Sequence, residues 1–208
     1  MSQLINLSEK EMDYMEDVDF LLTRRKINRK INRLLLQCEA DIKHYLKVRQ
    51  IAFPDGVKFK AGKIAKGENY LKLPYYMLDF PRQFSQDSIF AMRTMFWWGH
   101  YFCVTLHLSG EALDAYRESI MRNLCSLKQT DLYVYHHPSD PWLHHVAKDT
   151  YRKLDDWDES QLQQHLAEVE HLKLCEVLPL NKWNHLPAFT IDFLRKMLSL
   201  VSLLPRKH

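Results

Sequence analysis

The sequence is poor in glycine, and the few glycines fall in no nucleotide-binding or nucleophile pattern. Five glycines among 208 residues leave no G-x-G-x-x-G dinucleotide fingerprint and no G-x-S-x-G nucleophile elbow. Gly62 and Gly67 have the spacing of a phosphate loop, but Glu68 and Asn69 follow where Lys and Ser or Thr are required. The sequence therefore predicts neither a common nucleotide site nor a serine-hydrolase site, and it indicates no cofactor.

Paired cysteines, an export signal and long apolar runs are also lacking. No C-x-x-C pair occurs, so the cysteines are predicted to be reduced, buried thiols: Cys38, Cys103, Cys125 and Cys175. The first residues turn acidic at Glu9 and Glu11 instead of showing a basic start and an apolar core, so we expect a cytoplasmic protein. The longest apolar stretches, 96–104 and 197–204, are too short to span a bilayer, and no membrane partner is expected.

Neither positively nor negatively charged residues are in large excess. The net charge is +3, with 46% hydrophobic and 26% charged residues, which is typical of a single globular domain over residues 1–208. A basic run at 24–33 invites a nucleic-acid interpretation, but aromatic residues are not interleaved with it. We interpret this run as a solvated helix face, and a nucleic-acid partner is not expected.

The first fifty residues have helical spacing. Ser8 followed by Glu11 matches a capping box, which predicts a helix start. Apolar residues then recur mainly at intervals of three and four, as on one face of a helix that continues to about Gln50: Leu21, Ile27, Ile31, Leu34, Cys38, Ile42 and Tyr45. Pro54 and Gly56 are predicted to end this long N-terminal helix.

From about residue 57 to 108 the pattern becomes that of a mainly antiparallel sheet. Alternation predicts a strand at 57–61, and Pro74 confines the segment 70–80 to an edge, a bulge or a non-sheet crossing. The runs 89–97 and 101–108 read as a hairpin whose turn contains Gly99. A helix at 111–124, a strand at 132–136 and a helical C-terminal third complete a predicted α+β fold, with helix starts at Asp140, Asp158 and Pro187.

The loop length of the hairpin decides which face Arg93 occupies. A three-residue connection sets Arg93 opposite Thr105, whereas a two-residue turn sets it opposite Leu106 on the other face. We favour the three-residue connection, because an arginine that faces the core needs a buried acidic partner. Arg93, Thr105 and His107 are then expected to share one surface.

This surface is the predicted ligand site. Arginine is suited to orient an anion, aromatic walls exclude water, and a histidine can donate a hydrogen bond or carry a proton. The predicted ligand-binding residues for a small anionic or aromatic molecule are Arg93, His107, Tyr101, Thr105, Tyr75, Tyr76 and Trp98. The alternative is that a helix or a second subunit packs over the same face. The leading hypothesis is therefore a binding or protein-interaction module, with a homo-oligomer as one arrangement.

A histidine cluster supports a different hypothesis. Residues 135–145 contain His136, His137, Asp140, His144 and His145, all ligand types for a transition metal. Neighbouring histidines diverge, so only one of each pair can converge, and His137, Asp140 and His144 make the best candidate set. The spacing matches no named metal motif, which favours surface or hydrogen-bonded histidines. A metal-dependent enzyme is the alternative function, and no catalytic residue is assigned.

Two central segments resemble parts of a known group. The segments 67–82 (GENYLKLPYYMLDFPR) and 93–99 (RTMFWWG) are similar to sequences in an uncharacterised group of small bacterial proteins. The resemblance implies a bacterial cytosolic setting. It implies nothing about a substrate, a cofactor or a catalytic residue.

Overall fold

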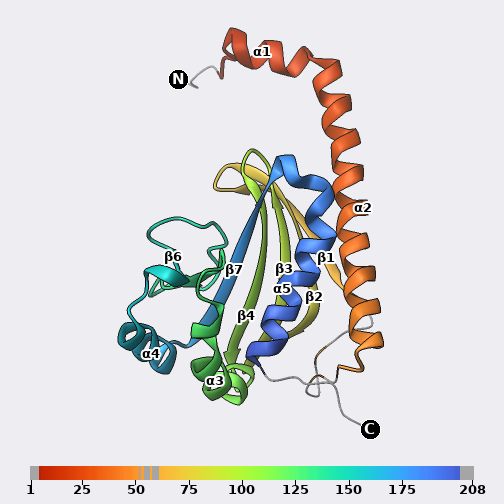
Figure 1. Cartoon of the computed structure of the whole chain (residues 1–208). Coiled ribbons are helices and arrows are strands. Elements are labelled where there is room, and N and C mark those ends of the chain that lie inside the picture. Colours follow the sequence, from red (N-terminus) through yellow and green to blue (C-terminus); the bar gives the residue numbers. More distant parts are fainter. Residues whose placement is uncertain (1–4, 52, 54–56, 58–60, 202–208) are drawn as a thin grey trace.

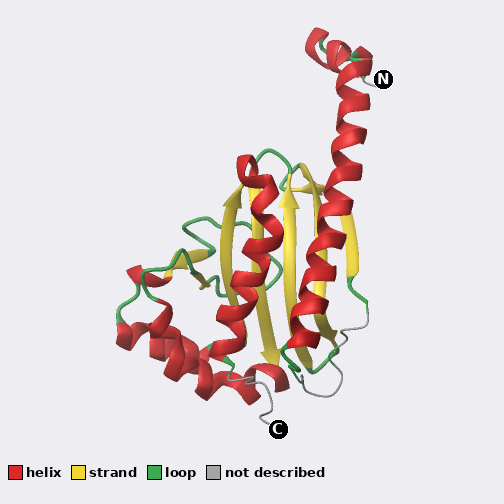
Figure 2. Ribbon diagram, turned by 45° about the vertical axis from the view of Figure 1, so that its right-hand side comes forward, coloured by secondary structure: helices red, strands yellow, loops and turns green. Residues whose placement is uncertain are grey.

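The computed structural model describes residues 5–51, 53, 57 and 61–201, and it has the predicted α+β architecture (Figures 1 and 2). The described strands form one antiparallel sheet in the order β1-β2-β3-β4-β7-β5-β6. They are β1 (Lys63–Tyr70), β2 (Leu73–Phe84), β3 (Ser88–Trp97), β4 (Tyr101–Gly110), β5 (Tyr133–Tyr135), β6 (Tyr151–Lys153) and β7 (His171–Pro179). The helices are α1 (Glu9–Glu16), α2 (Val18–Val48), α3 (Glu111–Asn123), α4 (Glu159–Glu168) and α5 (Leu186–Leu200), with short 3-10 helices at Leu124–Leu127, Leu154–Asp156 and Leu180–His185.

The N-terminal helix begins where the sequence predicts. The capping box of Ser8 and Glu11 is present. The helix is nevertheless interrupted, because the Asp17 side chain accepts a hydrogen bond from the Phe20 backbone nitrogen at 2.8 Å and so begins a second helix. Of the predicted apolar stripe, Ile31, Cys38 and Ile42 are buried, whereas Leu21 is exposed. Only the C-terminal part of α2, in which the buried residues begin at Ile31, therefore packs on the body of the protein.

The predicted hairpin is confirmed. Strands β3 and β4 are joined by residues 98–100, and Gly99 takes a φ of +75° in the turn. The register pairs Arg93 with Thr105, which is the outcome expected for a three-residue connection. Arg93, Thr105 and His107 consequently lie on one face of the sheet.

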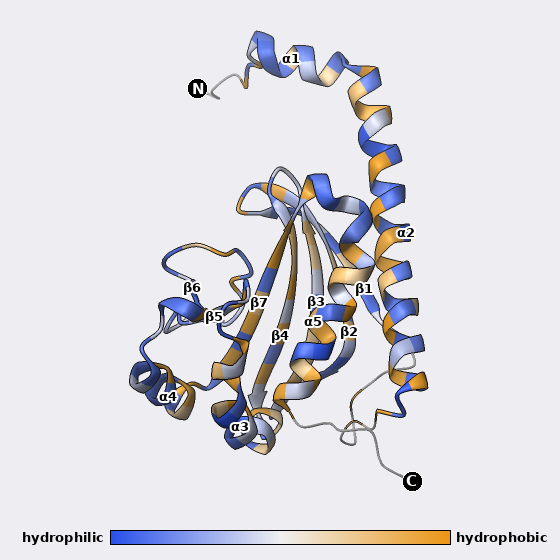
Figure 3. Ribbon diagram, in the orientation of Figure 1, coloured by the Kyte–Doolittle hydropathy of each residue, from blue (hydrophilic) through white to orange (hydrophobic). Residues whose placement is uncertain are grey.

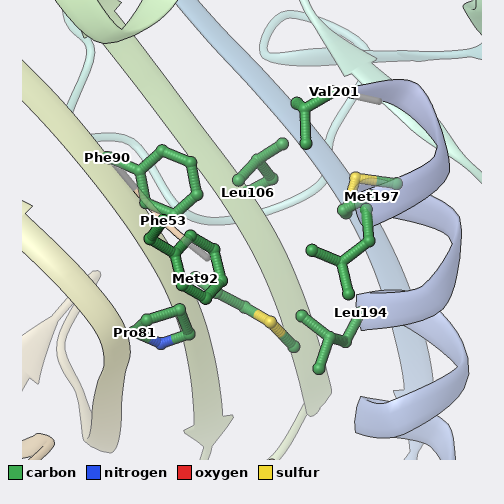
Figure 4. Close-up of a pocket in the computed structure, with 9 residues that line it drawn as sticks. Phe53, Pro81, Phe90, Met92, Leu106, Leu194, Met197 and Val201 are labelled. Atoms are coloured by element: carbon green, nitrogen blue, oxygen red, sulfur yellow. The ribbon is translucent and has the colours of Figure 1, made fainter. Parts of the chain in front are cut away.

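The opposite face of the sheet, which we call the helix face, carries the main core. In Figure 2, α2 and α5 lie across this face side by side. Figure 4 shows Met92 and Leu106 of the sheet directed toward Leu194 and Met197 of α5. These side chains leave a cavity of only about 10 Å³, hardly enough for one water molecule.

The C-terminal third is less helical than the sequence predicts. Residues 171–179 form β7, which inserts between β4 and β5. The helix expected at Asp140 is absent, because the Asp140 side chain accepts a hydrogen bond from the Trp142 backbone nitrogen at 2.8 Å within a turn. The helices that start after Asp158 and at Pro187 are confirmed. The strand expected at 57–61 falls mostly on residues outside those described.

Of the alternatives predicted for the segment around Pro74, the edge and the non-sheet crossing are wrong, whereas β2 does pair irregularly with both neighbours. Strand β2 lies between β1 and β3 and is an inner strand. Pro74 sits near its start, where its carbonyl accepts a hydrogen bond from the Trp98 backbone nitrogen at 3.1 Å. The register with β3 shifts between Asp79 and Arg82. The second proline, Pro81, lies in this irregularity, where the regular ladder of backbone hydrogen bonds is already interrupted.

Gly110, at the junction of β4 and α3, provides the first test of this fold. It has φ +55° and ψ −139°, and an added Cβ would lie 2.0 Å from the backbone oxygen of Asp87. We expect Gly110→Ala to lower the free energy of unfolding by at least about 2 kcal/mol, measured by urea unfolding. Gly99→Ala is the control. Its Cβ meets nothing closer than 3.9 Å, so it is expected to cost about 1 kcal/mol. Equal losses in the two variants would contradict the close approach at Gly110.

Candidate functional site

The face of the sheet turned away from α2 and α5 holds three buried charged residues, Asp79, Arg93 and Lys173. A fourth, Glu176 of β7, lies on the helix face and pairs with Lys196 of α5 at 2.6 Å. The register aligns Asp79 of β2 with Arg93 of β3, Thr105 of β4 and Cys175 of β7. His107 and Lys173 are paired one step further along the same face. We call this the cover face, because residues 136–150, the cover segment, pack against it.

The structure brings together five of the seven residues predicted to bind a ligand. Arg93, Thr105 and His107 share the cover face by register, and Tyr75 and Tyr101 contact its apolar cluster. The other two, Tyr76 and Trp98, pack against the main core on the helix face. Trp98 stacks edge-on against Phe96, with 5.5 Å between ring centroids. Tyr76 and Trp98 therefore cannot line a common pocket with Arg93.

Arg93 is held in a buried ion pair. Its Nε donates to Oδ1 of Asp79 at 2.6 Å, and its Nη2 donates to Oδ2 at 3.1 Å. Both residues are less than a tenth exposed, so each charge depends on the other for the solvation that it lost on folding. From the sequence we expected a buried acidic partner only if Arg93 faced the core. The structure places such a partner, Asp79, beside Arg93 on the cover face.

Two histidines adjoin this pair and remain neutral. Nε2 of His144 accepts a hydrogen bond from Nη1 of Arg93 at 3.1 Å, and Nε2 of His107 lies 3.2 Å from Nδ1 of His171. Burial, together with the positive charges of Arg93 and Lys173, lowers the pKa of both His107 and His144 to about 2. Nδ1 of His107 is buried without a hydrogen-bond partner among the described residues.

Lys173 is the other buried cation of the cover face, and it is 1% exposed. Its Nζ donates to the backbone oxygens of Pro141 and Leu143 and lies 4.1 Å from the ring centroid of Tyr135. No carboxylate pairs with Lys173 in the described part of the chain. Burial lowers the pKa of this amine to about 7. Lys173 therefore fastens the cover segment to β7 through carbonyl groups.

Two tyrosines fasten the same segment from other strands. The Tyr70 hydroxyl accepts from the backbone nitrogens of His144 and His145 at 2.6 and 3.1 Å and lies 2.9 Å from Nδ1 of His145. The Tyr101 hydroxyl accepts from the Val146 backbone nitrogen at 2.7 Å. The polar groups of the cover face thus bind a segment of this same chain. Packing over the face was the expected alternative, although a helix or a second subunit was foreseen in that place.

The candidate metal set of His137, Asp140 and His144 is not assembled. Nδ1 of His137 accepts from the Asp140 backbone nitrogen at 3.3 Å, whereas His144 is turned to the guanidinium of Arg93. A cation beside that guanidinium would be repelled. Within the described ranges, no group of three or more His, Cys, Asp or Glu side chains is placed to hold a metal ion.

A cleft of about 550 Å³ opens beside the cover segment, between residues 135–141 and 165–171. We call it the histidine cleft, because four imidazoles line it: His136, His137, His165 and His171. His171 joins the cleft to the cover face through its contact with the buried His107. Burial lowers the pKa of His165 and His171, so both rings act mainly as neutral hydrogen-bonding groups at pH 7.

Three carboxylates also line the histidine cleft: Asp140, Glu168 and Glu170. No ion pair formed within the described residues involves them. The cleft walls include no lysine or arginine side chain of the described residues. The three carboxylates therefore give the cleft a negative character, the opposite of what the sequence predicts for the ligand site around Arg93.

The sequence reasoning missed Asp79, Lys173 and His171. A signal for Lys173 and His171 was present, since His171, Lys173 and Cys175 alternate with Leu172 and Leu174 as in a half-buried strand. Asp79 lies in a run of apolar residues that was already predicted to be extended. Its pairing with Arg93 depends on the register of β2, which local spacing does not determine.

The comparisons with known proteins identify no relative: no family model, no curated protein and no solved structure matches the chain. None of the helices in the described ranges is both long and apolar enough to cross a membrane. The resemblance of the central segments to a bacterial group stays a prediction.

The ion pair of the cover face gives a stability prediction. Asp79→Asn keeps the shape of the side chain but leaves the Arg93 charge buried without its partner, so we expect a loss of about 3–5 kcal/mol in the free energy of unfolding. Asp131→Asn is the matched control, because Asp131 pairs with Lys153 through a side chain that is 83% exposed. That control is expected to change stability by less than about 1 kcal/mol. A loss below about 1 kcal/mol for Asp79→Asn would contradict the prediction, because the Arg93 charge would then be solvated without Asp79.

The buried imidazoles predict lability to acid. The unfolded chain takes up a proton at each histidine near pH 6.5, whereas folded His107 and His144 do so only near the lowered pKa of about 2. The unfolded state therefore binds more protons between these values, and stability falls as the pH falls below about 6.5. Each imidazole contributes up to about 1.4 kcal/mol per pH unit.

Urea unfolding measured at several pH values from neutral down to about pH 5 checks this pH dependence. A smaller slope is expected for the double variant H107Q/H144Q, and stability that does not change over this range would refute the assignment.

Proposed function

We propose that this protein is a binding module and that its ligand site is the histidine cleft beside the cover face. The observation that carries the proposal is the convergence of four imidazoles and three carboxylates on one cleft of about 550 Å³. Cavities of this size are typical of small-molecule sites. The cleft is open, whereas the cover face is occupied by the protein's own chain.

The charges of the cleft favour a polar ligand with a positively charged amine or guanidinium group. Asp140, Glu168 and Glu170 have no cationic partner among the described residues, so a ligand cation gains three nearby carboxylates. The ring of His137, whose centroid lies 6.4 Å from that of the buried Tyr135, supplies an aromatic surface for the body of such a ligand. The imidazoles add hydrogen bonds that fix its orientation.

An anionic ligand at Arg93 stays a prediction, and its binding there would cost free energy in two steps. The Arg93 guanidinium already donates two hydrogen bonds to Asp79 and one to His144. An anion at this place has to displace the cover segment and share the guanidinium with Asp79, and each step costs free energy. The cleft requires neither step, which is why we place the ligand there.

The cover face supports the cleft in this proposal. His107 holds His171 at 3.2 Å, and Lys173 holds the backbone of Pro141 at 3.1 Å. Both contacts fix walls of the cleft from behind. The partner is therefore a small molecule, or a peptide side chain of the same charge, and the cover face acts as its rigid support.

The experiment uses agmatine, a small guanidinium amine, as the probe, with inorganic phosphate at matched ionic strength as the anionic comparison. We expect agmatine to produce saturable NMR shifts at the imidazoles of His137 and His171. The double variant E168Q/E170Q should weaken this binding at least about tenfold, because two of the three carboxylates are lost. The control D155N/D156N removes two exposed carboxylates outside the cleft and should leave the affinity unchanged.

Other results would contradict the proposal in distinct ways. Shifts at His107 and His144 with phosphate, and none with agmatine, would return the ligand site to Arg93. Saturable shifts with Zn²⁺ at His137 would favour the metal-dependent alternative. Equal affinity for agmatine in E168Q/E170Q and in the unchanged protein would show that the cleft is not the site.

A further inference from the structure

The N-terminal part of the described chain projects from the body as an arm (Figure 1). The arm comprises residues 5–23, and every one of them is exposed. It contains nine of the exposed large hydrophobic residues of the protein: Ile5, Leu7, Met12, Tyr14, Met15, Val18, Phe20, Leu21 and Leu22. Such a concentration of apolar side chains on a projecting element is typical of an interaction surface.

The apolar surface of the arm continues the stripe with which α2 packs on the sheet. Phe20 precedes Ile27 and Ile31 on the same helix face by seven and eleven residues. Ile31 is fully buried, whereas Phe20 is 46% exposed. The stripe thus runs beyond the end of the sheet, and Figure 3 shows hydrophobic residues interspersed with hydrophilic ones up to the top of α2.

Charge is divided into two blocks along the same helices. The acidic block, residues 9–19, contains six carboxylates and one lysine: Glu9, Glu11, Asp13, Glu16, Asp17 and Asp19, with Lys10. The basic block, residues 24–33, contains six cations and no carboxylate: Arg24, Arg25, Lys26, Arg29, Lys30 and Arg33. Among the ion pairs of the described residues, only Arg24 of these blocks takes part, with Glu68. Glu11 and Asp17 accept hydrogen bonds that cap α1 and α2. None of the other charges is paired with an opposite charge among the described residues.

We propose that the arm is a dimerisation element that pairs in antiparallel fashion with the arm of a second copy of this chain. A two-fold axis near Leu21 lays the acidic block of each copy on the basic block of the other, with the apolar residues around Leu21 at the centre. A parallel pairing would instead lay like charges on each other. The two blocks are complementary in sign and closely matched in number, which identifies the same chain as its own partner.

Most of these charges lie too far apart to neutralise each other within one chain. The centres of the two blocks are about fourteen residues apart, which is about 20 Å along a helix. This exceeds the screening length of about 8–10 Å at physiological ionic strength. Moreover, α1 turns away from α2 at Asp17 (Figure 1). In Figure 1, α1 turns sideways from the top of α2, so that most of the acidic block does not lie along the basic block of its own chain.

The arm and the basic block together have the extent that a dimer needs. They comprise residues 5–33, close to the roughly 20–30 residues that each side of a standard interface contributes. A nucleic acid or an anionic membrane suits the basic block alone, because both would be repelled by the acidic block next to it. These partners are therefore outcomes of the test and not the proposal.

The experiment measures the mass of the full chain by sedimentation equilibrium at about 50 mM and about 500 mM salt. We expect a dimer whose association weakens as the salt concentration rises.

The variant E9K/D13K/E16K gives both blocks a net positive charge, and R25E/K26E/R29E/R33E gives both blocks a net negative charge. Each variant alone should dimerise at least about tenfold more weakly than the unchanged chain, because every block then meets its own sign. An equimolar mixture of the two should form a heterodimer, because the two chains then carry opposite signs along the whole arm.

Controls separate this proposal from its competitors. E118K/D156K/D192K reverses three exposed carboxylates outside the arm and should dimerise like the unchanged chain, and circular dichroism verifies that every variant is folded. A monomer at tens of micromolar in low salt, or failure of the mixed variants to associate, would overturn the proposal. Tight binding of RNA or anionic vesicles that is lost in R25E/K26E/R29E/R33E, without dimerisation, would assign the basic block to that partner instead. None of these results depends on the histidine cleft.

Discussion

The Asp79–Arg93 ion pair is the constraint on which the cover face depends. Two opposite charges on neighbouring strands are removed from water, and their pairing repays that cost only if nearby groups satisfy the remaining donors. His144 supplies one acceptor for the guanidinium. Lys173, unpaired with any described carboxylate, draws two carbonyl groups of the cover segment over the face. The irregular course of residues 136–150 thus follows from the charges that it covers.

The two faces of the sheet are consequently stabilised by different interactions. The helix face is covered by the apolar stripes of α2 and α5, and its contacts are mainly non-directional apart from the ion pair between Glu176 and Lys196. The cover face is held by hydrogen bonds from specific backbone groups to specific strand residues, such as those from His144 and Val146 to Tyr70 and Tyr101. This difference allows the cover face to support the cleft at its margin, where the irregular residues 136–141 meet the end of α4 and the start of β7.

The sequence predicted those features that depend on local spacing. The capping box at Ser8, the hairpin at Gly99 and the pairing of Arg93 with Thr105 all follow from residues close together in the chain. The features that were missed depend on distant contacts. The cover segment takes its course from residues more than forty positions away, such as Tyr70 and Tyr101.

The candidate site was predicted in part for the same reason. The sequence correctly grouped Arg93 with His107 on one face, because alternation along a strand determines it. It also grouped Tyr76 and Trp98 with them, although these two side chains pack on the helix face. The histidine cleft escaped prediction because its walls come from 135–141 and 165–171, and no local pattern joins these two segments.

The ends of the sheet have a consequence for how copies of the chain can associate. One terminal strand, β1, bears Lys63 and Lys66 and loses regular register between Gly67 and Tyr70, and the other, β6, is only three residues long. Short, lysine-bearing or irregular borders are poor templates for adding a further strand from another molecule. Edge-to-edge addition of strands into a continuous sheet is therefore discouraged by the borders of the sheet itself, and assembly through helices can end at a closed pair.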